Sequence, residues 1–301
     1  MPYSTSFGLS NRASPTMVSW KTAAARSGAK AALRLRHDLD IPRDAAVDPF
    51  EVAERMKVQV RYMALSSMEG MYARRPGPLV MLSTLRPRGR RHFTLGHELG
   101  HHHFDHGTQV DEYVDGTTDD GSEEERLANA FSRNLLMAPR AVRAALSGMN
   151  IDPDTLTPHE AYRLSSFFGV AYAALINHLC WSMRLITKYQ LKDLLRVQPG
   201  TVKLELTDQK CNGVVEVVDE RWVHRPLDLR VDDLAIVPAT ASVVGNVLEA
   251  LRPVRDGLLV RAAAPGIGQV TTSSWAVFAR VEPHEFVGIA KYRHLEPEDE
   301  D

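Results

Sequence analysis

The stretch that decides the fold of this chain is RRHFTLGHELGHHHF, residues 90–104, which combines helical apolar spacing with an H-E-x-x-H motif. The spacing predicts a helix over Phe93–Phe104. Residues four apart on a helix share one face, so His97 and His101 can bind one metal ion through their ring nitrogens. Glu98 follows the first histidine, where its carboxylate can take a proton from a water beside the metal. The motif predicts a catalytic Glu98 and a zinc cofactor, with Mn²⁺ or another divalent ion as the alternative.

A zinc peptidase site needs a third protein ligand, and the sequence offers one further along the chain. Glu125 lies 24 residues after His101, in a helix predicted over Ser122–Met137 whose first residue is the N-cap. Asn129 is four residues beyond Glu125 and shares its helix face. Its amide can bond the far ring nitrogen of a ligand histidine and fix the ring orientation. We therefore predict His97, His101 and Glu125 as ligands, supported by Asn129.

Other residues near the motif leave alternative ligand sets open. His102 and His106 form a second i, i+4 pair, but no glutamate follows the first of them. Glu123 and Glu124 compete with Glu125, although three successive residues of a helix point in different directions and only one can face the metal. Helical geometry, with the amide four residues further on, favours Glu125.

Three residues are candidates for contact with a substrate, namely His103, Arg90 and Arg91. The arginines belong to the basic loop Arg86–Arg91, which can grip an acidic segment, although a charged surface loop is the commoner explanation of such a run. The apolar stretch Leu79–Leu82 is predicted to be a strand that pairs with an extended substrate.

The rest of the chain predicts an α+β fold. Further helices are predicted over residues 20–35, 49–56 and 157–186, a strand over 58–63 and an acidic loop over 105–124. From about Val202 the runs KLEL, GVVEVV, LAIVPA, GLLVRAA and WAVFARV are typical of strands. The predicted domains are a flexible arm (1–18), a mostly helical, zincin-like metallopeptidase domain with a small sheet (19–148), a helical segment like a helix-turn-helix (149–195), a strand-rich α+β domain that senses, regulates or selects substrate (196–295) and an acidic tail (296–301).

Composition narrows the class of protein. The 301 residues are 44% hydrophobic and 25% charged, as in ordinary globular proteins, and the net charge of −2 gives no overall drive toward nucleic acid or anionic membrane. We find no signal peptide and no apolar run long enough to cross a membrane. Two unclustered cysteines, Cys180 and Cys211, are typical of a reducing compartment. We expect a cytoplasmic protein without membrane contact.

Residues 158–180 resemble a helix-turn-helix with Gly169 at the turn. The segment in the position of a recognition helix, AYAALINHLC, has no Arg or Lys for phosphates or guanines. We therefore expect no direct DNA binding, and interpret these helices as packing elements.

Several motifs, in one order, resemble the ImmA/IrrE metallopeptidase family. They are the stretch at 90–104, ERLANAFSRNLLMAP at 125–139, DPFEVAERMKVQV at 48–60 and FFGVAYAALINHL at 167–179. The resemblance covers roughly residues 25–190. Gly96 and Ala138 depart from the usual family pattern without touching the expected site.

The resemblance implies a zinc endopeptidase with His97, His101 and Glu125 as metal ligands and Glu98 as general base. It also implies a partner, a helix-turn-helix (XRE-like) repressor whose cleavage derepresses stress, mobile-element or toxin–antitoxin genes. The alternative is a non-catalytic, metal-containing sensor or transcriptional regulator that acts through its C-terminal domain. The intact Glu98 argues against that alternative, because a purely structural metal site has no use for a base.

Overall fold

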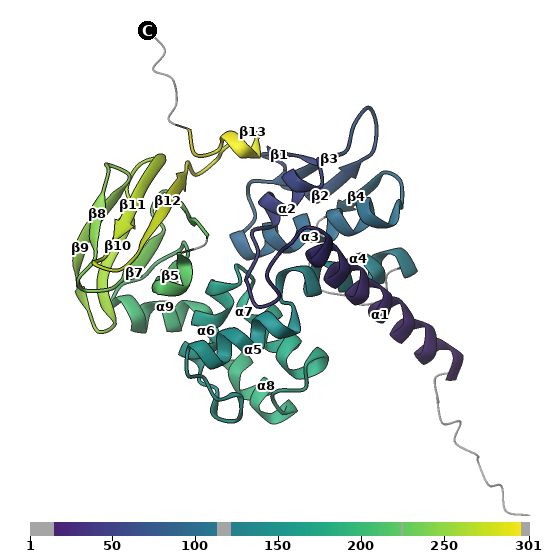
Figure 1. Ribbon diagram of the computed structural model, residues 1–301, viewed down its shortest axis with the longest axis horizontal. Coiled ribbons are helices and arrows are strands. Elements are labelled where there is room, and N and C mark those ends of the chain that lie inside the picture. Colours follow the sequence, from purple (N-terminus) through teal and green to yellow (C-terminus); the bar gives the residue numbers. More distant parts are fainter. Residues whose placement is uncertain (1–14, 113–121, 224, 296–301) are drawn as a thin grey trace, which may run out of the picture.

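The computed structural model describes residues 15–112, 122–223 and 225–295. Its N-terminal half combines helices with one sheet (Figure 1). The helices are α1 (Pro15–Asp38), α2 (Pro49–Arg55), α3 (Arg88–Phe104), α4 (Glu123–Leu136) and α5 (Pro139–Gly148). The strands are β1 (Gln59–Met63), β2 (Met68–Ala73), β3 (Leu79–Ser83), β4 (Gln109–Glu112) and β13 (Gly288–Ile289), the last from the far end of the chain.

Helix α3 is enclosed by the sheet and by α4. The strand order is β13-β1-β3-β2-β4, and only β1 and β3 run parallel. Helix α3 contacts β2, β3 and α4, and α1 packs along α4. Leu82 of β3, Leu95 and Leu99 of α3 and Phe131 of α4 are fully buried between these layers. Burial of these side chains fixes α3 on both sides.

Side-chain caps set where two helices begin. Asp48 accepts a hydrogen bond from the Phe50 amide at 2.9 Å and starts α2, with Pro49 at the first helical position. Ser122 accepts one from the Glu125 amide at 3.3 Å and starts α4. The second cap places Glu125 in the first turn of α4, as the sequence predicts.

Helices continue through the middle of the chain. They are α6 (Pro158–Phe167), α7 (Tyr172–Asn177), α8 (Lys188–Arg196) and α9 (Pro199–Thr207), with the short turns η1 (Pro153–Thr155) and η2 (His178–Ser182). Helix α6 and the α7–η2 helix are bent by 101° at Gly169, whose φ of +62° favours glycine. An angle of this size occurs in helix-turn-helix units. Among the described residues no single helix is long and apolar enough to cross a membrane, and this bent pair meets that test only when taken together.

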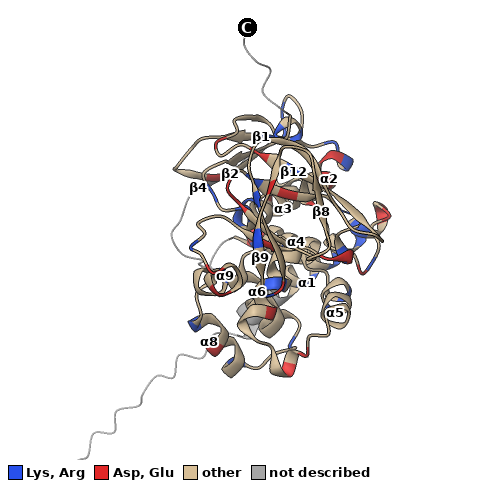
Figure 2. Cartoon of the chain, turned by 90° about the vertical axis from the view of Figure 1, so that its left-hand side faces the viewer, with Lys and Arg blue, Asp and Glu red and all other residues tan. Residues whose placement is uncertain are grey.

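The C-terminal half consists mainly of two four-stranded sheets. The strands are β5 (Val215–Val217), β6 (Leu227–Arg230), β7 (Leu234–Val237), β8 (Ser242–Val244), β9 (Leu248–Val254), β10 (Gly257–Ala262), β11 (Gly266–Thr271) and β12 (Ala276–Glu282), with the turns η3 (Glu220–Trp222) and η4 (Ala290–Tyr292). One sheet has the order β5-β7-β10-β9 and the other β6-β12-β11-β8. Figure 2, which faces these sheets, shows basic and acidic residues intermingled, in keeping with the small net charge.

Two expected local structures in the first half are wrong. Residues 15–18 belong to α1 and not to a flexible arm. Arg88–Arg91 form the first turn of α3 and not a loop. Pro87 is the N-cap, and the helical hydrogen bonds begin directly after it. Residues 1–14 of the predicted arm and the predicted acidic tail lie outside the described residues.

Three expectations about strands are also corrected. The KLEL run lies in α9, where Pro199 starts a helix and Val202 is buried. The predicted loop 105–124 contains β4, while its residues 113–121 lie outside the described part. Strand β3 is bonded to β1 on one edge and β2 on the other, so it has no free edge for a substrate.

Candidate metal centre

Close packing of α3 on α4 brings the predicted ligands within reach of one another. A Cβ at Gly100 would lie 2.9 Å from the Ala128 Cα, and one at Gly96 would lie 2.6 Å from the Ser132 hydroxyl oxygen. That hydroxyl donates to the Phe93 carbonyl oxygen at 2.7 Å and ties the two helices together. Small residues at these positions thus allow short side chains on the two helices to meet.

The side chains of His97, His101 and Glu125 converge. Their ligand atoms lie within 4.8 Å of one another. The two Nε2 atoms are 2.9 Å apart, Glu125 Oε2 is 3.2 Å from His97 Nε2, and Oε1 is 3.3 Å from His101 Nε2. Two ligands bound tetrahedrally at the usual zinc–nitrogen distance lie about 3.3 Å apart. The spacing and the donor set therefore fit zinc, and the cluster can hold a metal ion.

Hydrogen bonds to the far ring nitrogens orient both histidines. His97 Nδ1 lies 3.1 Å from Asn129 Oδ1, an atom that only accepts, so the proton sits on Nδ1 and Nε2 presents a lone pair. His101 Nδ1 lies 2.9 Å from His106 Nδ1, and with His101 as the donor its Nε2 also presents a lone pair. Two lone pairs and a carboxylate that face each other are stabilised by a cation between them.

Charge at the cluster is set by Glu125. The close contacts with the imidazoles of His101 and His97 outweigh the opposing effect of burial and hold the pKa of the Glu125 carboxyl well below its usual range. The group is therefore ionised at neutral pH. A negative ligand beside two neutral imidazoles offsets half of the charge of a divalent ion.

Glu98 is fully buried beside the ligands on α3. Strand β2 approaches its carboxylate at Gly70, where a Cβ would lie 2.7 Å from Glu98 Oε1. A larger residue at position 70 would therefore displace this carboxylate. The sequence prediction missed Gly70, because β2, with a glycine and a glutamate in its first half, lacks the regular alternation of a strand.

The alternative ligand sets are not assembled. His102 Nδ1 is hydrogen-bonded to the Tyr72 hydroxyl at 2.8 Å. His106 is hydrogen-bonded to His101 and does not form a ligand pair with His102. Glu123 and Glu124 are exposed on the first turn of α4. Among the ligand sets considered, only His97, His101 and Glu125 lie close enough together in the described residues to hold one metal ion.

His106 supports the cluster through its contact with His101. Asp105 adopts a left-handed conformation (φ 59°) and ends α3, and the His106 amide donates back to the His101 carbonyl oxygen at 3.1 Å. This turn brings the two imidazoles together.

Two of the predicted substrate contacts lie away from the metal ligands. His103 stacks on Phe131 with ring centroids 5.2 Å apart, about 200° around α3 from His101 at 3.6 residues per turn. Arg90 bonds to Glu69 of β2, with Nε and Oε2 3.0 Å apart. Neither residue belongs to the cluster.

The prediction for Arg91 is wrong. Only 5% of its side chain is exposed, so it cannot reach out to a substrate. It donates to the Tyr62 hydroxyl at 2.9 Å and pairs with Glu282 of β12 at 2.7 Å. Arg91 therefore links the helix that carries the metal ligands to the C-terminal half.

Comparison with known proteins identifies the N-terminal part of the chain. Residues 53–179 match the model of the IrrE N-terminal-like domain of M78 peptidases. No curated protein matches. Among solved structures, a Mycobacterium tuberculosis transcriptional regulator matches with 18% identity over 54% of this chain and 47% of that protein, at a TM-score of 0.28. The matched segment contains His97, Glu98, His101 and Glu125, so this part of the chain is similar to the metallopeptidase domain of the ImmA/IrrE family.

Proposed function

We propose that this protein is a zinc-dependent endopeptidase. The observation that carries the proposal is the convergence of His97, His101 and Glu125 next to the buried carboxylate of Glu98 on the same helix. Two imidazoles and one carboxylate are the ligand set of zinc peptidases, which keep a further position open for chemistry. A structural zinc site more often has four protein ligands, commonly including cysteine.

Each residue of the cluster has a task in peptide hydrolysis. A zinc ion held by His97, His101 and Glu125 supplies Lewis-acid activation of water and of the scissile carbonyl. Glu98 accepts the proton of the attacking water and delivers it to the departing amide nitrogen. Asn129 keeps the ring of His97 in the tautomer that leaves Nε2 free for the metal.

The proposed substrate is a helix-turn-helix (XRE-like) repressor, whose cleavage would derepress stress, mobile-element or toxin–antitoxin genes. The likeness to the ImmA/IrrE family supports this partner. Because β3 has no free edge, we propose β4 as the strand that binds the substrate. Among the described residues β4 has a strand neighbour only on its β2 side. An extended segment of the substrate would pair there through main-chain hydrogen bonds.

Co-expression with candidate repressors tests the proposal. We expect wild-type protein to produce discrete repressor fragments and Glu98→Gln to produce none, while both purified proteins retain zinc. Glu123→Gln, at an exposed position on α4, is the matched control and should cleave like the wild type. Fragments that persist with Glu98→Gln would exclude Glu98 as the base. Bound zinc with no cleavage of any candidate would favour the alternative, a non-catalytic regulator.

A further inference from the structure

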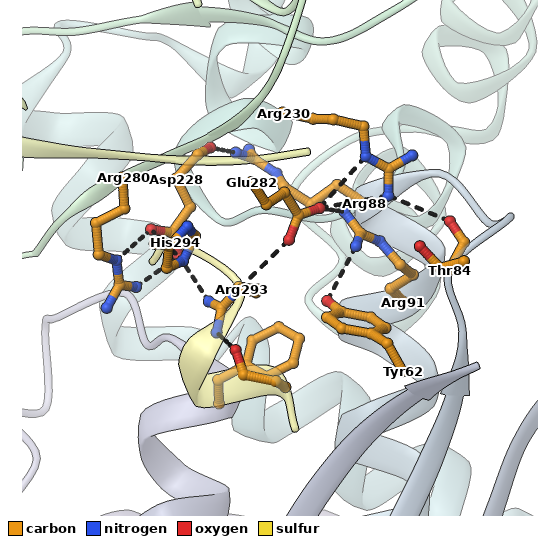
Figure 3. Close-up of polar contacts among 12 residues, drawn as sticks. Tyr62, Thr84, Arg88, Arg91, Asp228, Arg230, Arg280, Glu282, Arg293 and His294 are labelled. Atoms are coloured by element: carbon orange, nitrogen blue, oxygen red, sulfur yellow. Dashed lines mark hydrogen bonds and ion pairs between the residues drawn. The ribbon is translucent and has the colours of Figure 1, made fainter. Parts of the chain in front are cut away.

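A buried network of arginines and carboxylates joins α3 to the C-terminal half (Figure 3). Arg88 donates to the Asp228 carbonyl oxygen at 2.7 Å and pairs with Glu216, while Arg91 pairs with Glu282. Glu282 also accepts from Arg230 and Arg293. These groups are shielded from water, so any charge left without a counter-charge is costly.

A small cavity lies beside this network, between the two halves. Its volume is about 30 Å³, room for roughly two water molecules. Residues from α3, from the turn after α6, from η3 and from the segment between η3 and β6 line it, among them Arg88, His92, Gly169, Trp222 and Arg225. The cavity is separate from the metal cluster, whose residues do not line it.

The charges around the cavity do not balance. Six arginines are present in the network and the cavity wall: Arg88, Arg91, Arg225, Arg230, Arg280 and Arg293. Five carboxylates face them: Asp48, Glu216, Asp228, Asp233 and Glu282. Every arginine except Arg225 has an ion pair with one of these carboxylates. Among the described residues the surplus positive charge is therefore that of Arg225.

The surroundings of Arg225 leave donors for a ligand. Its guanidinium carbon lies 3.9 Å from the centroid of the Trp222 ring and 4.9 Å from that of Phe167, and one amino group donates to the Phe167 carbonyl oxygen. Its other N–H groups have no hydrogen-bond partner in the described part of the chain. Burial, with the charge of Arg88, lowers the pKa of Arg225 to about 9 against the attraction of Asp48, Asp228 and Asp219, none of which pairs with it directly.

The carboxylates that line the same cavity are already neutralised. Asp48 accepts from the Phe50 amide at 2.9 Å and from Arg280 at 3.1 Å. Asp228 accepts from Arg280 at 2.5 and 2.6 Å and from Arg293 at 3.2 Å. Although burial opposes it, these bonds hold the pKa of Asp228 well below its usual range. Both carboxylates attract Arg225 from a distance, but among the described residues neither forms an ion pair with it.

A second donor faces the cavity from α3. His92 Nδ1 is buried and has no hydrogen-bond partner among the described residues. Gly169 makes room in front of this atom, since a Cβ there would lie 2.7 Å from it. A neutral imidazole can carry its proton on Nδ1 and donate. His92 and Arg225 thus supply donors from the two halves of the molecule.

We propose that this cavity binds a small monovalent anion, of the class of chloride, bromide or bicarbonate, between Arg225 and His92. One negative charge balances the single surplus positive charge, and the volume admits a ligand of that size. Because the donors come from α3 and from the C-terminal half, the bound anion holds the two halves together. The site does not depend on the proposed peptidase activity.

Thermal unfolding of the full chain in bromide tests the site. Sodium bromide is titrated against sodium gluconate at constant ionic strength, because the bulky gluconate cannot enter the cavity. At a hundredfold excess over the Kd we expect bromide to raise the Tm by about 5 °C. Arg225→Met, which keeps the stacking on Trp222 but not the charge, should lose this shift. Arg221→Met, at an arginine that is paired with Asp219 outside the network, should retain it.

If Arg225→Met fails to fold, crystals of the wild-type protein test the site instead. Crystals of the wild-type protein soaked in bromide should show an anomalous peak within hydrogen-bond distance of Arg225. An equal Tm shift in wild type and Arg225→Met, the absence of any shift in the wild type, or a cavity without a peak would each overturn the proposal.

Discussion

Helix α3 carries two buried polar clusters of opposite character. In its first turns Arg88 and Arg91 meet carboxylates of the C-terminal half, so that donors face acceptors and the charges nearly cancel. Further along, His97 and His101 turn lone pairs toward the carboxylate of Glu125. The first cluster is paired mainly with protein groups and joins two parts of the fold. The second has the donor set and the spacing to hold a cation.

The largest expected effect is on metal binding. Glu125→Ala removes the anionic ligand and should weaken zinc affinity on the order of a thousandfold or more, since the binding energy of such sites is shared among few ligands. Metal titration monitored by competition with a chelator measures the change. Glu124→Ala, at an exposed neighbouring position, should bind zinc like the wild type. Equal losses in the two variants would mean that Glu125 is not the third ligand.

The network should show its effect in stability and not in metal affinity. Glu282→Ala leaves Arg91, Arg230 and Arg293 without a shared carboxylate and should cost about 3–5 kcal/mol, because buried charges lose their partner. A lowered Tm at unchanged zinc affinity is the expected result. Glu285→Ala, at an exposed position nearby, is the control. An unchanged Tm would show that the network does not hold the halves together.

Acid should weaken the network further. Burial and the neighbouring Arg293 lower the pKa of His294 to about 4, against the attraction of Asp228. Between pH 6.5 and 4 the unfolded chain therefore binds more protons at this residue than the folded one, and stability falls as the pH falls. The loss from this group is about 3 kcal/mol. Urea unfolding at several pH values should show a shallower dependence in His294→Gln, whereas replacing the exposed His284 should leave it unchanged.

A smaller effect is expected from the amide that orients His97. Asn129→Ala should weaken zinc affinity 10–100-fold, roughly the range for removing such a partner. Asn134→Ala removes an amide from the same helix that bonds to the Ala130 carbonyl oxygen instead. Affinity that falls equally in both variants would point to a general loosening of α4 and not to the orientation of His97.

The two clusters also differ in how far the sequence predicts them. Ligand spacing within α3, and the first turn of α4 with its serine cap, are local patterns, so the two helices and the proximity of His97, His101 and Glu125 were predicted correctly. The partners of Arg88 and Arg91 are Glu216 of β5 and Glu282 of β12, each more than a hundred residues away along the chain. Pairing across such distances leaves no local pattern, and a run of arginines was therefore interpreted as a surface loop. The same reason explains why β13 in the N-terminal sheet was not foreseen.

Zinc K-edge X-ray absorption of the purified protein tests whether His97, His101 and Glu125 bind zinc. We expect one zinc ion per chain, with two imidazole nitrogens at about 2.0–2.1 Å and carboxylate oxygen among its ligands. His101→Ala should remove one imidazole from these ligands. A protein without metal when zinc is supplied, or a coordination shell unchanged by His101→Ala, would contradict this assignment.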